Sequence, residues 1–160
     1  MQEATAITVL KDFKFRVEIN GLECALVQEF NPGSRSHGVA EHAGGGQNFT
    51  VKEAGMIKYN DAVLKMVVPI EGPGKRYFYD WMNQAQDPST GNGLSPKEYR
   101  RNFSVYEEDN TGTPVRVWEY YMAFPSSFDL GNKSAHSVDK NVIDEIRITY
   151  SYYKMRTFND

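Results

Sequence analysis

Histidines are the first candidates for chemistry in this sequence, because imidazole is the commonest metal ligand and base near neutral pH. His37 and His42 are five residues apart and lie beside glycines, and His136 is the third histidine. Helical zinc motifs place two histidines four residues apart so that both reach one metal ion. We therefore interpret His37 and His42 as solvated loop side chains and expect no metal site.

Other catalytic signatures are also incomplete. Gly44, Gly45 and Gly46 are followed neither by a Lys-Ser/Thr pair nor by a helix start, so a phosphate-binding loop is disfavoured. The sequence contains no Gly-x-Ser-x-Gly elbow. The acidic run 107–109 leads into a turn, where solvated charge explains it better than acid–base catalysis. These patterns favour a protein that is not an enzyme and needs no cofactor.

Cys24 is the single cysteine, which excludes a disulfide within the chain and any zinc site with several cysteines. It lies in a strand pattern that suits a small buried hydrophobe.

The composition of the sequence disfavours several other classes of protein. The 160 residues include 18 basic and 21 acidic residues, well mixed along the chain, which disfavours an electrostatic nucleic-acid binder. No apolar run is long enough to span a membrane, and the first residues lack the layout of a signal peptide. We expect one domain over 1–160 that folds in the cytoplasm and does not insert into a membrane.

The stretch 58–81 predicts a long strand followed by a helix. Its first half alternates, with Leu64, Met66 and Val68 on one face and Val63, Lys65 and Val67 on the other. Pro69 and the turn 72–74 stop this strand. A helix over about 75–86 then carries a narrow apolar stripe formed by Phe78, Trp81, Met82 and Ala85.

The other segments predict strands and loops. Residues 1–11 form an unassigned N-terminal arm, and strands 13–19 and 22–30 pair through Asn20-Gly21, a strong hairpin signal. The Gly-rich segment 31–48 reads as a long loop that leaves the sheet, and 49–53 as a short strand that ends before Gly55.

Three further strands complete the expected sheet. A loop over 87–96 precedes strands 99–105 and 115–124, which flank the turn 109–112. A polar connection over 125–141 then leads to a last strand, 143–154. We expect shared faces for Trp118, Tyr120, Met122 and Phe124, and for Ile146, Ile148, Tyr150 and Tyr152. About seven or eight strands with one flanking helix predict a mainly β protein, an antiparallel sandwich or barrel.

The order of these motifs resembles the tail tube proteins of contractile phage tails and contractile injection systems, relatives of the type VI secretion tube protein. The resemblance covers most of the chain. It is carried by Phe15, Val17 and Ile19 before Asn20-Gly21, by the stretch 55–65 with Lys58, Tyr59 and Leu64, by Tyr79-Asp80-Trp81, and by Val117-Trp118, Ala123-Phe124-Pro125 and 143–146. Glu53-Ala54-Gly55 departs from the Leu-Pro-Gly that often stands before the long strand in this family.

The resemblance implies a tail-tube fold and a structural role. Six subunits would form a ring, and stacked rings would form a hollow tube through which DNA or an effector passes without specific binding. Implied partners are further copies of the chain, a sheath protein, a baseplate and a tail terminator. The subunit would reside in a virion tail assembled in the host cytoplasm, or in an injection particle.

The resemblance also implies roles for particular residues. The loop 31–48 would contact a neighbouring subunit or ring through Arg35, His37, Val39, Glu41, His42 and Gly45. Lys14, Arg16 and Glu18 would face the lumen, and Phe78, Trp81 and Met82 would clamp the core.

Two alternatives stay open at this point. One is a tube-initiator or baseplate-proximal ring protein with the same fold. The other, from a different class, is a monomeric β-barrel that binds a small ligand among its aromatic side chains.

Overall fold

A computed structural model of the chain describes residues 14–19, 22–23, 27–46, 48–67, 76–131 and 142–158. These residues form ten strands and two helices: β1 Phe15–Ile19, β2 Leu22–Glu23, β3 Val27–Asn31, β4 Arg35–His42, β5 Val51–Tyr59, β6 Ala62–Val67, α1 Tyr77–Ala85, α2 Pro96–Tyr99, β7 Arg101–Glu108, β8 Pro114–Asp129, β9 Ile143–Thr149 and β10 Tyr152–Thr157. Predictions made for the arm 1–11, Phe13, Asn20-Gly21, Cys24, the turn 69–74 and His136 fall outside the described residues.

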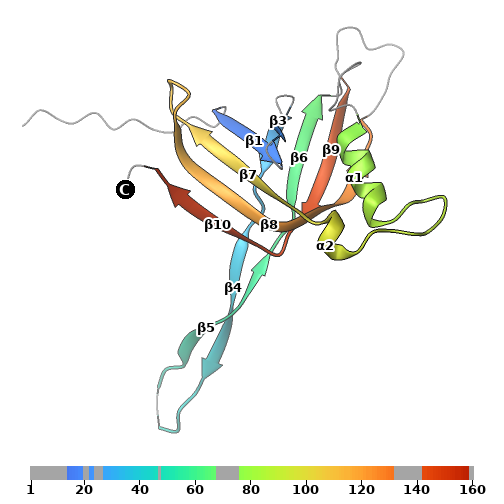
Figure 1. The fold of residues 1–160 in the computed structure, drawn as a ribbon. Coiled ribbons are helices and arrows are strands. Elements are labelled where there is room, and N and C mark those ends of the chain that lie inside the picture. Colours follow the sequence, from blue (N-terminus) through green and yellow to red (C-terminus); the bar gives the residue numbers. More distant parts are fainter. Residues whose placement is uncertain are drawn as a thin grey trace, which may run out of the picture.

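The strands form two layers that share the long strand β8 (Figure 1). In the first layer β1 pairs with β7, β7 with the first part of β8, and β10 with that same part. In the second layer the last part of β8 pairs with β9, β9 with β6, and β6 with β3. All of these pairs are antiparallel, which confirms the predicted fold class.

The core lies between the two layers. Val17, Phe103 and Tyr120 of the first layer meet Leu64 and Ile148 of the second, and all five are buried. The alternation predicted for the strand before the helix is confirmed over β6, where Leu64 and Met66 are buried while Val63, Lys65 and Val67 are half-buried.

Helix α1 lies within the predicted range 75–86 and packs against β8. Phe78 and Trp81 are buried and Met82 is half-buried. The indole nitrogen of Trp81 donates a hydrogen bond to the carbonyl of Tyr99 at 2.6 Å, so α1 is tied to the short helix α2. The sequence pattern missed α2, because it read 87–96 as a loop and Tyr99 as the start of a strand; Ser95 and Glu98 form a capping box there.

The first predicted hairpin is confirmed only in the two residue pairs that flank residues 20–21. Glu18 pairs with Glu23 and Ile19 with Leu22, as the Asn20-Gly21 signal predicts. The second strand does not continue to residue 30 beside β1, because β3 pairs with β6 instead. In this pairing the Phe30 ring lies edge-on to the Tyr120 ring, with 5.9 Å between ring centroids. Burial of apolar surface in this contact favours the pairing of β3 with β6.

Strand β8 departs from the predicted alternation at Met122. Its φ of 54° is left-handed and its side chain is 40% exposed, whereas Ala123 is fully buried. This conformation and the adjacent bulge shift the buried face by one residue, so Met122 does not share the face of Tyr120. The strand also runs through Pro125 to Asp129 in pairing with β9, and the prediction of a polar connection from residue 125 is wrong over that part.

The predicted last strand is two strands. Ile146, Ile148 and Tyr150 are buried as expected, but the strand stops after Thr149. The chain then turns to pair with β8 as β10, so Tyr153 packs on the core and Tyr152 stacks on Tyr121 on the opposite face. The break exists because β9 and β10 belong to different layers.

Segment 31–48 leaves the sheet as predicted, but it is not a loop without regular structure. β4 pairs with β5 over most of their lengths, and β5 runs through Gly55, where a break was predicted. The real break follows Tyr59. Backbone pairing overrides the weak strand propensity of this glycine-rich segment, since Gly38 and Gly55 lie opposite each other and a Cβ on Gly55 would approach the Gly38 carbonyl oxygen to 3.0 Å.

Candidate functional site

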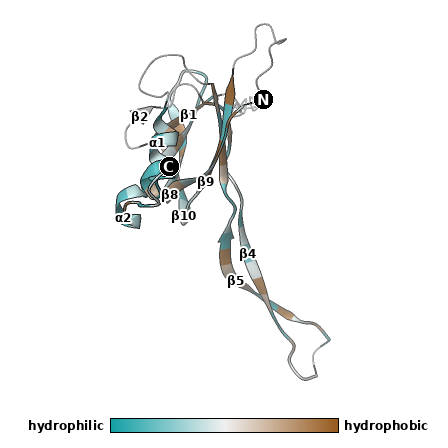
Figure 2. Ribbon diagram, turned by 90° about the vertical axis from the view of Figure 1, so that its right-hand side faces the viewer, coloured by the Kyte–Doolittle hydropathy of each residue, from teal (hydrophilic) through white to brown (hydrophobic). Residues whose placement is uncertain are grey.

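The β4–β5 hairpin is the most exposed element of the described chain. Figure 1 shows it projecting away from both layers, and Figure 2 shows the same from the side. Gly38, Gly55 and Tyr59 are half-buried, and the other side chains of the two strands are exposed. An isolated two-stranded hairpin is marginally stable in water. We therefore expect this hairpin to be stabilised by contact with a partner.

Apolar side chains gather on this hairpin and at its tip. Val39 is 64% exposed, Phe49 67% and Met56 81%, and Val51 and Ile57 are also exposed. Figure 2 shows hydrophobic bands along both strands. The register places Val39 and Val51 on opposite faces of the hairpin, so both faces expose apolar side chains. Exposed apolar surface of this kind indicates an interaction site in soluble proteins. Covering it would remove this surface from water, which is the driving force for association.

The loop residues named from sequence all lie on this hairpin or its tip. Arg35, His37, Val39, Glu41 and His42 belong to β4, and Gly45 lies in the tip turn; all are exposed. His37 and His42 fall on opposite faces of the strand, since their spacing is odd. His42 lies 3.6 Å from Glu53 and Glu41 lies 3.5 Å from Lys52, exposed pairs of the kind that contribute about 0–1 kcal/mol. Within the described residues no group of three His, Cys, Asp or Glu could hold a metal ion.

The outer face of the first layer carries both signs of charge, and it also contains Tyr106 and the fully buried Val117. The strand register aligns Glu18, Ser104, Glu119 and Lys154 in one row, and Arg16, Tyr106, Val117 and Arg156 in the next. Arg16 lies 3.6 Å from Glu108 and over the Tyr106 ring. The alternation predicted for β1 is confirmed: Val17 and Ile19 are buried on the core side, while Arg16 and Glu18 are half-buried on the other. Lys14 precedes β1, and its carbonyl accepts a hydrogen bond from Glu108.

Three described strands lie at the edges of the layers: β10 and the two-residue strand β2 in the first layer, and β3 in the second. β10 pairs with β8 alone and β3 with β6 alone. An edge strand presents unpaired N–H and C=O groups that can pair with another chain. Met155 and Phe158 are exposed along and just after β10. The first layer can therefore be extended by a neighbouring copy.

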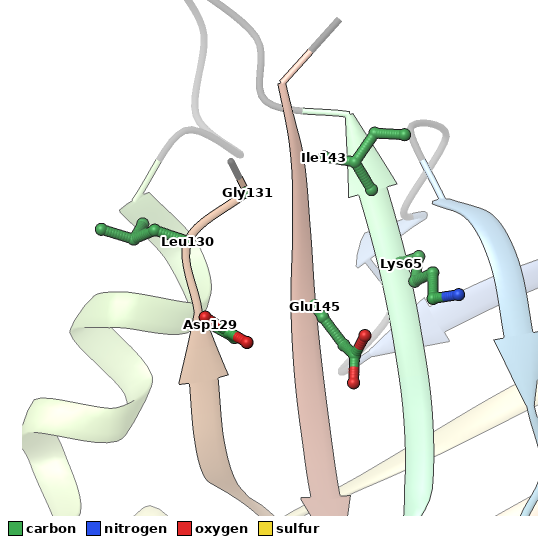
Figure 3. Close-up of a pocket in the computed structure, with 6 residues that line it drawn as sticks. All are labelled: Lys65, Asp129, Leu130, Gly131, Ile143 and Glu145. Atoms are coloured by element: carbon green, nitrogen blue, oxygen red, sulfur yellow. The ribbon is translucent and has the colours of Figure 1, made fainter. Parts of the chain in front are cut away.

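A shallow cavity of about 260 Å³ lies at the far end of the second layer. Figure 3 shows Asp129, Glu145 and Lys65 on three neighbouring strands, with Leu130, Gly131 and Ile143 beside them. Lys65 also pairs with Glu29 at 3.2 Å. Between the layers, in contrast, buried aromatic side chains fill the core of the described chain. This packing disfavours a barrel that holds a small ligand inside.

The carboxylates considered for catalysis have structural partners. Glu107 pairs with Arg116, and Glu108 with Arg16. Asp109 accepts hydrogen bonds from Thr111 and Thr113, and the Thr111 hydroxyl contributes most to holding its pKa below the usual range. Asp109 thus closes the predicted turn between β7 and β8. Burial raises the pKa of Tyr150 to about 12 and raises that of Tyr120 further.

No helix in the described residues is long and apolar enough to cross a membrane.

Comparisons with known proteins give one family and a set of related folds. Residues 11–154 match the family described as T4-like virus tail tube protein gp19. No curated protein matches the chain.

Solved structures share the fold at low sequence identity. A chain of the sheath–tube complex of an extracellular contractile injection system (PVC) in the extended state is similar with a TM-score of 0.75 and 20% identity, over 94% of this chain and 93% of that one. A chain of the anti-feeding prophage tube-terminating cap has a TM-score of 0.81 and 15% identity, over 98% and 97%. Hcp1 from Flavobacterium johnsoniae has a TM-score of 0.54 and 10% identity, over 91% and 97%.

Proposed function

The chain belongs to the T4-like virus tail tube protein family, and from this premise we propose that it is a structural subunit whose hexameric rings stack into the hollow inner tube of a contractile phage tail or injection particle. The observation that carries the proposal is the hairpin with its exposed apolar side chains. A monomer would leave these side chains in water, whereas an assembly of identical subunits covers them. The subunit is a conduit component and not an enzyme.

The hairpin is the contact between subunits or rings in this proposal. Val39, Phe49 and Met56 supply apolar area, and Arg35, His37, Glu41, His42 and Gly45 lie around them. The Glu41–Lys52 pair near the tip is exposed, so it contributes specificity more than affinity. Burial of the apolar side chains supplies the free energy of association.

The outer face of the first layer lines the lumen in this proposal. The layer has five described strands, β2, β1, β7, β8 and β10, an outer face with charges of both signs, and the open edge of β10. Closing such layers edge to edge around a ring leaves no free edge, which is the general solution to the edge-strand problem. Lys14, Arg16 and Glu18 then face the channel together with Glu119 and Lys154. A lumen with mixed charge lets an anionic cargo such as DNA pass without strong phosphate contacts.

Further copies of the chain, a sheath, a baseplate and a terminator are the proposed partners. Residues 1–160 act as one domain, and the place of action is the virion tail or the injection particle. A tube initiator next to a baseplate is the second candidate, since a chain of that fold occurs in a baseplate structure.

The test is a register-matched truncation of the hairpin. Val39 pairs with Ala54, so residues 39–54 are replaced by Asn-Gly, which keeps the His37–Ile57 pair. We expect rings or tubes in negative-stain images of the full chain, and a folded protomer without rings for the truncation, judged by circular dichroism and sedimentation.

Point variants give a matched control. Met56→Ser removes an exposed apolar side chain on the hairpin, and Leu94→Ser removes one that is 46% exposed in the loop before α2. Only Met56→Ser should weaken assembly. Rings formed by the truncation as readily as by the full chain would refute the role of the hairpin, and a strictly monomeric full chain at high concentration would refute the tube itself.

A further inference from the structure

The root of the hairpin, residues 31–34 and 59–61, is where the projecting element meets the core. Beyond this root β4 and β5 pair only with each other among the described strands. Their side chains are mostly exposed, so the other described residues supply little further support. The direction of the hairpin is therefore decided at its root.

Tyr120 reaches this root from the middle of the core. Its ring is fully buried, stacked on Phe103 with 4.4 Å between ring centroids and edge-on to Tyr150 at 4.8 Å. Its hydroxyl donates a hydrogen bond to the carbonyl oxygen of Pro32 at 3.0 Å. Because neighbouring rings hold the Tyr120 ring in place, the hydroxyl is a fixed point that restrains the residues just before β4.

Gly33 brings the two strands of the root into close contact. It has a φ of 72°, and a Cβ at this position would lie 2.4 Å from the Asn60 carbonyl oxygen and 2.9 Å from the Tyr150 hydroxyl. The backbone N–H of Asn60 donates to the Ser34 carbonyl at 2.9 Å, and the Asn60 side-chain amide donates to the Ser34 hydroxyl at 2.6 Å. Only glycine allows this approach without displacing backbone or a buried tyrosine.

The second strand of the root is tied to the same part of the core. The Thr149 hydroxyl donates to the Asp61 carboxylate at 3.0 Å. The Tyr59 ring lies edge-on to Tyr150 at 5.8 Å and to Tyr153 at 5.4 Å. Both strands of the hairpin are thus attached to the buried tyrosine cluster before they leave it.

We propose that Tyr120 and Gly33 are positioning residues that fix the direction in which the β4–β5 hairpin leaves the core. The eight residues of β4 make a lever about 27 Å long at about 3.4 Å per residue. A tilt of about 10° at the root moves the tip by about 5 Å, which is one strand spacing in a sheet. A specific contact at the tip therefore requires a fixed root. The direction is a property of the single chain, and only its consequence for assembly rests on the proposed function.

The test measures the direction of the hairpin by the distance between two spin labels. Ala43→Cys at the tip and Thr113→Cys before β8 are both at exposed positions, and Cys24→Ser removes the single native cysteine. Labelled protein is diluted into unlabelled protein so that only pairs within one chain contribute. We expect a narrow distance distribution in this background, and in Tyr120→Phe and Gly33→Ala a distribution at least twice as wide or a mean shifted by about 5 Å.

Tyr77→Phe is the matched control. It also removes a tyrosine hydroxyl that makes a hydrogen bond, with Arg101 at 2.6 Å, but it lies on α1. Its distance distribution should be unchanged. Tyr120→Phe keeps the buried ring, so its melting temperature should fall by only a few degrees.

The outcomes separate this inference from the proposed function. Distributions in Tyr120→Phe and Gly33→Ala that match the labelled background would overturn the positioning role, and if Gly33→Ala does not fold, Tyr120→Phe decides alone. A wider distribution in variants that still form rings as readily as the full chain supports the positioning role and counts against the hairpin as an assembly contact. A wider distribution with lost rings supports both.

Discussion

Removing the Trp81 side chain is the sharpest test of how the core is closed. Trp81 is fully buried, stacks on Phe78 with 6.1 Å between ring centroids, lies under the Arg101 guanidinium at 4.9 Å and donates a hydrogen bond to Tyr99. Truncation of a buried tryptophan to alanine costs about 3–5 kcal/mol, a figure that includes the cavity left behind. We expect Trp81→Ala to lose about 4 kcal/mol, a large share of the 5–15 kcal/mol typical of a whole domain.

Urea unfolding followed by far-ultraviolet circular dichroism measures this loss. With a denaturant slope of about 2 kcal/mol per molar, the midpoint should fall by about 2 M. The measurement is made at several protein concentrations, because assembly stabilises the folded subunit by mass action. A midpoint shift that persists at the lowest concentration belongs to the protomer.

Two variants serve as controls for Trp81→Ala. Trp81→Phe keeps much of the buried ring but loses the hydrogen bond to Tyr99, so its loss should be intermediate. Tyr79→Ala changes a 43% exposed side chain on the same helix and should cost less than about 1 kcal/mol. A Trp81→Ala protomer within about 1 kcal/mol of the original, or one that is equally stable and merely fails to assemble, would refute the clamp.

Three further predictions concern other parts of the molecule. The folded chain holds the Tyr150 proton up to a pKa of about 12, above the usual value of about 10, so stability is intact below pH 10 and falls as the pH rises from 10 to 12. Tyr150→Phe should reduce the fall in urea midpoint over that range, and an unchanged fall would contradict this. Met122→Gly should raise the unfolding free energy by up to about 1 kcal/mol, because glycine removes the cost of a left-handed φ; a lower melting temperature would count against it, and Met122→Val should destabilise. In assembled tubes of the Lys154→Cys, Cys24→Ser protein, a small maleimide should react, whereas a large polyethylene-glycol maleimide should react much more slowly than it does with the free protomer. If assembly slows neither reagent, Lys154 lies outside the lumen.

The local patterns of the sequence predicted the protein class and several elements. Alternation identified β1 and β6, and the stripe of Phe78 and Trp81 identified α1, because burial of one face leaves a period in the sequence. The Asn20-Gly21 signal predicted the pairing of β1 with β2. The ordered motifs carried the resemblance to tail tube proteins, which the family match over residues 11–154 confirms.

Errors occurred where a strand passes from one partner to another. β2 pairs with β1, but β3 pairs with β6. β8 passes between layers at Met122, and the chain after Tyr150 turns back to β8. Such changes depend on which distant strand is available for pairing, and the local alternation of apolar and polar residues carries no information about this. The Met122 bulge adds one residue and reverses the face of those that follow, so the predicted face fails there.

The candidate site was also predicted only in part from the sequence. From residue types alone, segment 31–48 could be recognised as an excursion without a core of its own, since glycine and polar side chains bury little apolar surface. That it is a hairpin aimed by Tyr120 and Gly33 depends on a partner strand and on Tyr120, which is 88 residues away in sequence from Pro32. Local composition determines which segments can be buried; only the three-dimensional pairing of distant segments determines where a segment that cannot be buried will point.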